Sequence, residues 1–179
     1  MSVPISSMNA LIWFVLPLWS QIAPSVAIST PPAAIVALGE TCEARVALTI
    51  AKGFHIQANP ASEKWLIPAE LKLKSSKEVR ARAGRPEYPS GKPFQLKNGQ
   101  KLATYKGTVE IHFPIEIKKS AKPGRHELSG TFRYQACDNQ TCLFPETIPV
   151  KVPLEIIAMT QAHAKSKKLA PCAIASTLP

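Results

Sequence analysis

Short segments with strand-like alternation, separated by turn residues, constrain the fold of this chain more than any other feature. Apolar residues occupy every second position in ARVALTI (44–50), ELKLK (70–74) and TVEIHF (108–113). Asn98-Gly99 and Pro123-Gly124 mark turns between such segments. No stretch has the period of a long amphipathic helix, and 17 prolines against 8 glycines fit a β-rich, loop-rich domain. The pattern predicts an all-β protein with about seven or eight short strands, which favours a β-sandwich.

The expected strands can be placed by their residue ranges. They are 44–50, 53–56, 70–74, 79–83, 108–113, 114–117, 125–134 and 147–157. We expect the segment 79–83 to pair beside 70–74. From 84 to 102 the chain is rich in Pro, Gly and Lys, and we expect a long loop there, of the kind that is usually functional or mobile.

The N-terminal segment has the composition of a secretory signal. An apolar run of about ten residues, NALIWFVLPL (9–18), is followed by the small residues Ser25 and Ala27, which predicts export with cleavage after Ala27. The run is short for a membrane span, which takes about 20 apolar residues. No Lys or Arg precedes Arg45, however, so an uncleaved membrane anchor is the alternative.

These features divide the chain into four expected regions. A single domain at 40–158 follows a signal peptide at 1–27 and a flexible lead-in at 28–39. The tail at 159–179 is built mainly from Ala, Ser, Lys, Thr and Pro with little apolar bulk, and we expect it to be disordered.

The net charge of +10 raises the question whether the chain binds a negatively charged partner such as nucleic acid. The lysines are spread over many short segments, without the aromatic-plus-basic cluster of a base-stacking surface, so we do not expect nucleic acid as a partner. We expect no metal and no cofactor, because the histidines are scattered. They are His55, His112, His126 and His163. Trp65 is expected in the core or at its rim.

Two of the four cysteines lie in one predicted hairpin. In FRYQACDNQTCLFPETIP (132–149), strand-like runs flank Cys137, four polar residues and Cys142. Opposed strand residues have Cα atoms about 4.5–5.5 Å apart, which permits a disulfide. A ring of six residues stabilises by only about 2 kcal/mol, so both a structural and a redox-active bridge are open. Asp138 disfavours a thiolate on Cys137, which fits a pair that reacts when a partner docks.

The residues around this pair resemble a known family. Tyr134-Gln135-Ala136-Cys137 and then Cys142-Leu143-Phe144-Pro145-Glu146-Thr147 resemble the periplasmic N-terminal domain of the thiol–disulfide interchange protein DsbD. Upstream, the segments 53–60 (GFHIQANP), 65–68 (WLIP), 88–92 (YPSGK) and 105–107 (YKG) resemble further family landmarks. The similarity extends from about Glu40 to Ile157.

The resemblance implies an immunoglobulin-like β-sandwich in the periplasm with Cys137 and Cys142 as its redox-active pair. It implies transient mixed disulfides with thioredoxin-like proteins or domains, and a role in supplying electrons to disulfide isomerases and cytochrome c biogenesis. A cap loop within 88–105 would cover the pair with an aromatic side chain. We expect Cys142 to face the partner. The candidates for cap-loop or partner docking are His55, Tyr88, Phe94, Leu102, Tyr105, Tyr134 and Phe144.

The other two cysteines, Cys42 and Cys172, lie outside the family pair. They are candidates for a structural disulfide; unpaired thiols or a bridge to another chain are the alternatives. The 179 residues contain neither the membrane domain nor the thioredoxin-like domain of a full protein-disulfide reductase, so we expect a membrane reductase to act in trans. Whether the module counts as an enzyme is open. The competing hypothesis is a non-catalytic secreted immunoglobulin-like binding module with structural disulfides.

Overall fold

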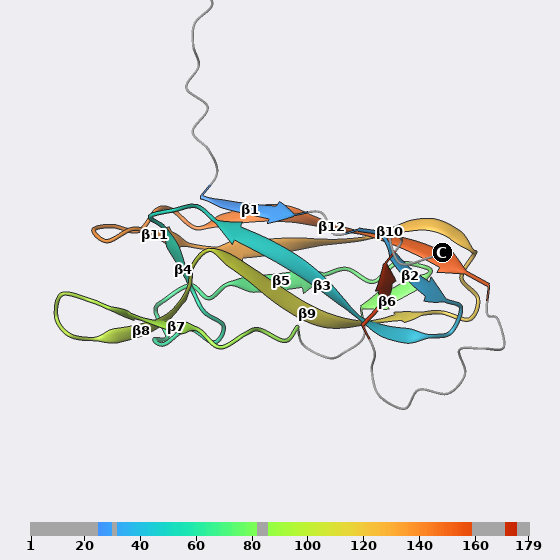
Figure 1. Ribbon diagram of the computed structural model, residues 1–179, viewed down its shortest axis with the longest axis horizontal. Helices are drawn as coiled ribbons and strands as arrows, with labels where there is room; N and C mark the ends of the chain where they lie inside the picture. The colour runs from blue at the N-terminus through green and yellow to red at the C-terminus, as the bar shows by residue number, and fades with distance from the viewer. Residues whose placement is uncertain (1–24, 30–31, 82–85, 159–170, 175–179) are drawn as a thin grey trace, which may run out of the picture.

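The computed structural model describes residues 25–29, 32–81, 86–158 and 171–174, and all regular structure in these ranges is β (Figure 1). Most of the predicted signal peptide and of the predicted tail lies outside the described residues. No helix in the described ranges is long and apolar enough to cross a membrane.

The strands form three sheets. Sheet A has the order β1-β3-β9-β6, with β1 Val26–Ser29, β3 Thr41–Ile50, β9 Thr108–Ile117 and β6 Val79–Ala81. Sheet B has the order β13-β2-β12-β10-β5, with β13 Ala173–Ile174, β2 Ala34–Ala37, β12 Glu146–Ile157, β10 Gly124–Tyr134 and β5 Glu70–Leu73. Sheet C has the order β11-β4-β8-β7, with β11 Ala136–Cys137, β4 His55–Gln57, β8 Lys101–Tyr105 and β7 Lys92–Gln95.

The core lies between sheets A and B and follows directly from the alternation in the sequence. Along β3 every second side chain is buried, including Val46 and Leu48, and β9 repeats the pattern. Leu128 and Phe132 of β10 face them from sheet B within one apolar cluster. Two packed β layers enclose one core: sheet A is antiparallel, and sheet B is antiparallel except for the parallel β2–β12 pair. This arrangement confirms the predicted all-β, immunoglobulin-like sandwich.

Sheet C extends the sandwich at one end, where β4, β7, β8 and β11 lie together (Figure 1). Its strands are short, and β11 follows β10 after a single residue, Gln135. Ala136, Ile56 and Tyr105 lie opposite one another across β11, β4 and β8, and all three belong to the main core. The opposite face of sheet C is therefore directed away from that core.

Several local expectations differ from the structure. Strand β6 pairs with β9 of sheet A, so the predicted pairing of 79–83 beside 70–74 is wrong. The expected loop at 84–102 contains β7 and the start of β8, joined by a turn in which Gly99 has a φ of 86°. Because Asn98-Gly99 supplies this turn, a Pro- and Lys-rich segment still forms a hairpin. Trp65 is 72% exposed instead of packed, since it lies in the turn before Leu66.

Strands also occur in regions expected to lack them. Strand β1 overlaps the start of the expected lead-in 28–39, and β2 lies within it. Both form because Val26 and the run Ile35-Val36-Ala37 are apolar enough to be buried. Cleavage after Ala27, which stays a prediction, would fall inside β1. In the expected tail, β13 pairs with β2.

Candidate functional site

The two cysteines of the predicted hairpin lie at the tip of the β10–β12 ribbon. Register between these strands runs without interruption from Gly124 opposite Ile156 to Tyr134 opposite Glu146. Beyond it, Cys137 and Cys142 form an isolated antiparallel bridge and a disulfide, with Cα atoms 3.9 Å apart. The long ribbon therefore projects the disulfide at the end of the sandwich.

The loop that connects the cysteines is held by its own polar groups. The Asp138 amide donates to the Thr141 carbonyl, and the Asp138 carboxylate accepts from the amides of Gln140 and Thr141, each at 2.7 Å. These bonds to Thr141 and Gln140 lower the pKa of Asp138. The carboxylate thus builds the loop, a role that its sequence position beside Cys137 did not predict.

The two sulfur-bearing residues differ in accessibility. Cys137 is 3% exposed, because it pairs with His55 across β11 and β4. Cys142 is exposed, and so are the residues that follow it, with Phe144 92% exposed and Leu143 40% exposed. A nucleophile from solvent therefore meets Cys142 first.

One face of sheet C surrounds the buried cysteine with polar side chains. Cys137 and His55 are opposed, Gln57 follows His55 on the same face, and Gln57 is opposed by Thr104 of β8. His55, Gln57 and Thr104 are all 2% exposed or less. Among the described residues, the buried side-chain atoms without a hydrogen-bond partner are His55 Nδ1 and Gln57 Oε1, and both lie on this face.

Phe94 of β7 closes this polar face. Its ring lies 4.1 Å from the imidazole of His55, centroid to centroid, and the Lys106 ammonium lies 4.6 Å above the same ring. Burial, with Lys106 as a second cause, lowers the pKa of His55, while Asp138 acts in the opposite direction. Burial therefore favours the neutral form of this imidazole.

The remaining docking candidates separate into two groups. Phe144 is exposed beside Cys142. Leu102 is buried, and the phenol groups of Tyr88, Tyr105 and Tyr134 are engaged: Tyr88 Oη accepts from the Leu71 amide, Tyr105 Oη donates to the Pro89 carbonyl, and Tyr134 Oη donates to Glu146. Burial raises the pKa of all three tyrosines. These four side chains fix the framework around the site.

The other two cysteines, Cys42 and Cys172, also form a disulfide, with Cα atoms 5.0 Å apart and 130 positions apart in the sequence. Cys42 belongs to β3, and the Cys172 amide donates to the carbonyl of Glu43. This bridge joins the segment 171–174 to the body of the sandwich.

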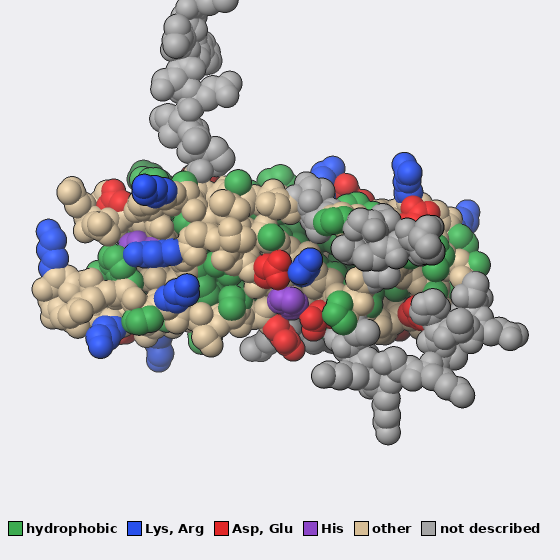
Figure 2. All heavy atoms as spheres, viewed as in Figure 1, with side chains coloured by type: hydrophobic (Ala, Val, Ile, Leu, Met, Phe, Trp, Pro, Cys, Tyr) green, Lys and Arg blue, Asp and Glu red, His purple; other side chains and the backbone are tan. Residues whose placement is uncertain are grey.

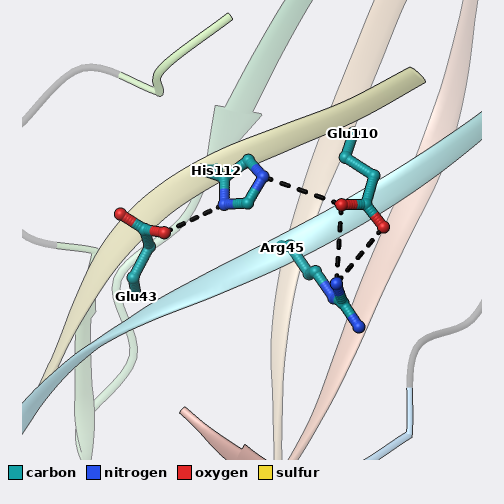
Figure 3. A network of polar contacts seen from close by, with 4 residues as sticks. All are labelled: Glu43, Arg45, Glu110 and His112. Atoms are coloured by element: carbon teal, nitrogen blue, oxygen red, sulfur yellow. Dashed lines mark hydrogen bonds and ion pairs between the residues drawn. The ribbon is translucent and has the colours of Figure 1, made fainter. Parts of the chain in front are cut away.

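A separate polar network lies near this second disulfide, on β3 and β9 (Figure 3). His112 Nδ1 lies 2.9 Å from Glu43 and Nε2 lies 3.7 Å from Glu110, and Arg45 contacts the other side of Glu110 at 3.4 Å. His112 is half-buried between the buried Ile111 and Phe113 of β9, and its ring lies between two carboxylates. No group of three His, Cys, Asp or Glu side chains in the described ranges is arranged so that it could hold a metal ion, and His163 lies outside those ranges.

A β-sandwich whose longest ribbon ends in an accessible, unequally buried disulfide defines a domain suited to thiol–disulfide exchange. A family model described as thiol:disulfide interchange protein DsbD, N-terminal, matches residues 27–153, more than half of the chain, and the chain belongs to this family. A thiol–disulfide exchange module is therefore the class of protein that sequence and structure support together.

Comparison with solved structures gives two similar domains. The N-terminal domain of Neisseria meningitidis DsbD in the reduced form is 16% identical, with 68% of this chain and 82% of that chain covered and a TM-score of 0.39. The N-terminal periplasmic domain of Proteus mirabilis ScsB is 16% identical, with 73% of this chain and 45% of that chain covered and a TM-score of 0.44. No curated protein matches the sequence.

Sequence reasoning missed Lys106, Gln57 and Thr104 as members of the site. Their only signal is strand register, because β4 and β8 bring them to the face that carries Cys137. Such short strands in a Lys- and Pro-rich region give little alternation from which to derive register.

Proposed function

We propose that this chain is a periplasmic relay that carries electrons from a thioredoxin-like reductant, itself supplied by a membrane reductase in trans, to periplasmic disulfide-containing proteins. Cys137 and Cys142 are the exchanging pair. The observation that carries the proposal is the unequal burial of this pair at the tip of the ribbon: Cys142 is exposed and Cys137 is 3% exposed. We propose a periplasmic location because the chain belongs to the DsbD N-terminal family and resembles the N-terminal periplasmic domain of ScsB.

The geometry favours one order of bond exchange. A thiolate of the partner attacks Cys142 Sγ, forming a mixed disulfide, and the bond to Cys137 breaks with Cys137 leaving as a thiolate. The second thiolate of the partner then attacks the mixed disulfide, which releases Cys142 and leaves the partner oxidised. Two electrons pass to the module. The reverse sequence reduces an acceptor.

Exposed apolar side chains next to Cys142 support a docking role for this tip. Phe144 and Leu143 are two of the four large hydrophobic side chains exposed among the described residues, and both directly follow the reactive cysteine. A groove separates this loop from the β7–β8 hairpin, and it is lined by Phe94, Asn139 and Gln140 among others. We propose that the surface around a partner's thioredoxin-type cysteine packs on Phe144 and this groove.

The charge of the same surface favours an acidic partner. Lys92, Lys97, Lys101 and Lys106 are all exposed, and no Asp or Glu occurs from residue 88 to 109. None of the ion pairs found in the described part of the chain includes any of these lysines. Figure 2 shows Lys and Arg side chains over the end of the molecule that carries β7, β8 and β11. A thioredoxin-like partner with an acidic rim would be steered to this end.

Trapping tests the exchange directly. A thioredoxin-like protein that lacks its resolving cysteine, activated as a mixed disulfide with a chromogenic thiol, is mixed with the reduced module. We expect Cys137→Ser, which retains the exposed thiol, to form a stable covalent complex with this partner. Cys142→Ser should form at least about tenfold less of that complex. The matched control is Cys42→Ser/Cys172→Ser, which keeps the hairpin pair and should be trapped as the parent chain is, under conditions in which circular dichroism shows it folded.

A reduction potential for the hairpin pair below about −300 mV, together with no trapping, would overturn the proposal, because bridges of that potential are structural. The result would favour the non-catalytic binding module.

Ionic strength tests the charge of the partner. If the lysines steer an acidic partner, the second-order rate of exchange falls about tenfold or more as salt is raised. Changing Lys92, Lys97 and Lys101 to Gln should remove most of that dependence. The matched control is Lys72→Gln with Lys151→Gln, since both lysines lie on sheet B and pair with carboxylates there. A rate that does not respond to salt contradicts the acidic partner and leaves the exchange itself standing.

A further inference from the structure

His55 is the one titratable side chain that the fold places directly opposite the buried cysteine. Cys137 of β11 and His55 of β4 are register partners in an antiparallel pair, so their side chains leave the sheet on the same face. Cβ atoms of such opposed residues lie about 4.5–5.5 Å apart. Since the sulfur is one bond from its Cβ and Nδ1 is two bonds from its own, the two atoms can come within hydrogen-bonding reach.

In the oxidised protein the Nδ1 atom of His55 is buried and has no hydrogen-bond partner among the described residues. His55 is 2% exposed, and Nδ1 is one of two buried side-chain atoms in the described ranges that have no hydrogen-bond partner. Leaving a buried polar atom without a hydrogen-bond partner costs free energy, and such atoms in a native structure call for an explanation. In the disulfide the sulfur of Cys137 carries no proton, so it cannot donate a hydrogen bond to Nδ1.

We infer that His55 Nδ1 is the proton acceptor for the Cys137 thiol, so that reduction of the disulfide supplies the hydrogen-bond partner that Nδ1 lacks. This role rests on the proposed exchange and deepens it. In the reduced module the Cys137 S–H donates to Nδ1. The geometry thus assigns His55 to the step in which Cys137 acts.

The proton and the electrons balance in that step. After the Cys142 thiolate has attacked an oxidised acceptor, a mixed disulfide joins the two proteins. Cys137 then attacks Cys142 Sγ, its proton passes to His55 Nδ1, the hairpin disulfide forms, and the acceptor leaves as a thiolate. The acceptor has gained two electrons. The imidazolium returns its proton to water, and a neutral imidazole is restored beside the disulfide.

Burial, and after it the charge of Lys106, lowers the pKa of His55 and so favours the neutral acceptor before the step. Lys106 follows β8 and opposes protonation of His55, whereas Asp138 follows β11 and favours it. From β7 the ring of Phe94 covers the imidazole, with Lys92 the only charged residue on that strand. A neutral imidazole opposed to a buried thiol acts as a general base when the two come within hydrogen-bonding reach.

Two measurements test the assignment. The first follows the His55 ring nitrogens by ¹⁵N NMR in the native chain, oxidised and reduced. We expect the Nδ1 signal to move on reduction and the Cys137 thiol and His55 to titrate as a coupled pair. Cys137→Ser/Cys142→Ser serves as the control in which reductant should change nothing. An Nδ1 signal that is the same in both redox states overturns the proposal, whatever happens to exchange.

The second measurement follows resolution of a preformed mixed disulfide at Cys142 as a function of pH. We expect His55→Gln to slow resolution about tenfold or more near neutral pH, with the rate of the first attack on Cys142 unchanged. The lost rate should return at high pH, where Cys137 ionises without a base. Equal loss at every pH would mark a purely structural role and refute the assignment. Failure of the parent chain to exchange at all would instead count against the proposed function.

Discussion

The two disulfides of this domain differ in the length of chain that they close and in their accessibility to solvent. Cys42–Cys172 closes a span of 130 positions, and Cys137–Cys142 closes a span of 5. The first ties a strand of sheet A to a segment on sheet B, with Cys42 buried in the core cluster. The second ends a ribbon, with one cysteine exposed. Under the proposed function, the length of chain that a disulfide closes and its accessibility to solvent separate a stabilising bridge from an exchanging one.

The largest expected effect is on stability. Removing the long bridge with Cys42→Ala/Cys172→Ala should lower the free energy of unfolding by up to about 5 kcal/mol, because it restores the entropy of a long loop in the unfolded chain. Cys137→Ala/Cys142→Ala should cost about 2 kcal/mol at most. Urea unfolding of the oxidised proteins measures both values. An equal or larger loss from the hairpin variant would break the comparison.

The next effect is on the order of reduction. With increasing dithiothreitol, Cys137–Cys142 should open first, at a rate at least about tenfold above that of Cys42–Cys172, because Cys142 is exposed whereas Cys172 is half-buried. Alkylation of the free thiols followed by mass spectrometry identifies which pair has opened. Simultaneous opening would contradict the separation of roles.

Phe94→Ala sharpens the same experiment. It uncovers the face that holds Cys137 and should speed reduction of the hairpin pair alone, by several-fold, since access governs exchange. Gly91→Ala should act in the same direction. A Cβ at Gly91 would lie 2.7 Å from that of Ala58 and 2.8 Å from that of Ala103, so the hairpin must shift.

A smaller effect concerns pH and His55. Burial lowers the pKa of His55, so between its folded pKa and its ordinary value of 6.5 the unfolded chain binds more protons than the folded one. Stability should therefore be complete above about pH 6.5 and fall as the pH drops through the folded pKa. His55→Gln should flatten this part of the profile in thermal unfolding. An unchanged slope would show that His55 is not the group responsible.

The smallest effect concerns Asp138. Its pKa is lowered, so it contributes stability above its unfolded pKa and loses it as pH falls through the folded pKa. Asp138→Ala should raise amide hydrogen exchange at Gln140 and Thr141 by less than about tenfold, because the carboxylate is exposed and its bonds are screened. Asp138→Asn, which keeps an acceptor oxygen, is the matched control. Protection that survives in the Ala variant would contradict the role of this carboxylate in the loop.

The sandwich could be predicted from the sequence because its central strands alternate over long runs. The ranges expected at 44–50 and 125–134 lie inside β3 (Thr41–Ile50) and β10 (Gly124–Tyr134). In sheet C only β4 (His55–Gln57) overlaps an expected strand, 53–56, because strands of two to five residues give too few positions for alternation to be seen.

The candidate site likewise has one part that local sequence predicts and one part that depends on strand pairing. The cysteine hairpin follows from local spacing. The face around Cys137 depends on which strands become neighbours, and Phe94 meets His55 only through β8, which pairs with both of their strands. Likewise, nothing in the sequence decided whether Cys42 and Cys172 would pair, because the choice depends on β13 lying against β2.

The long bridge has a mechanical consequence. A pull applied at Cys172 passes directly to Cys42 through the disulfide bond. Stretched in this way, the 130-residue loop stays closed and hides about 450 Å of contour length, taken at about 3.5 Å per residue. The strands that carry the proposed exchange site, β4, β7, β8 and β11, lie inside that loop and bear no tension from this end.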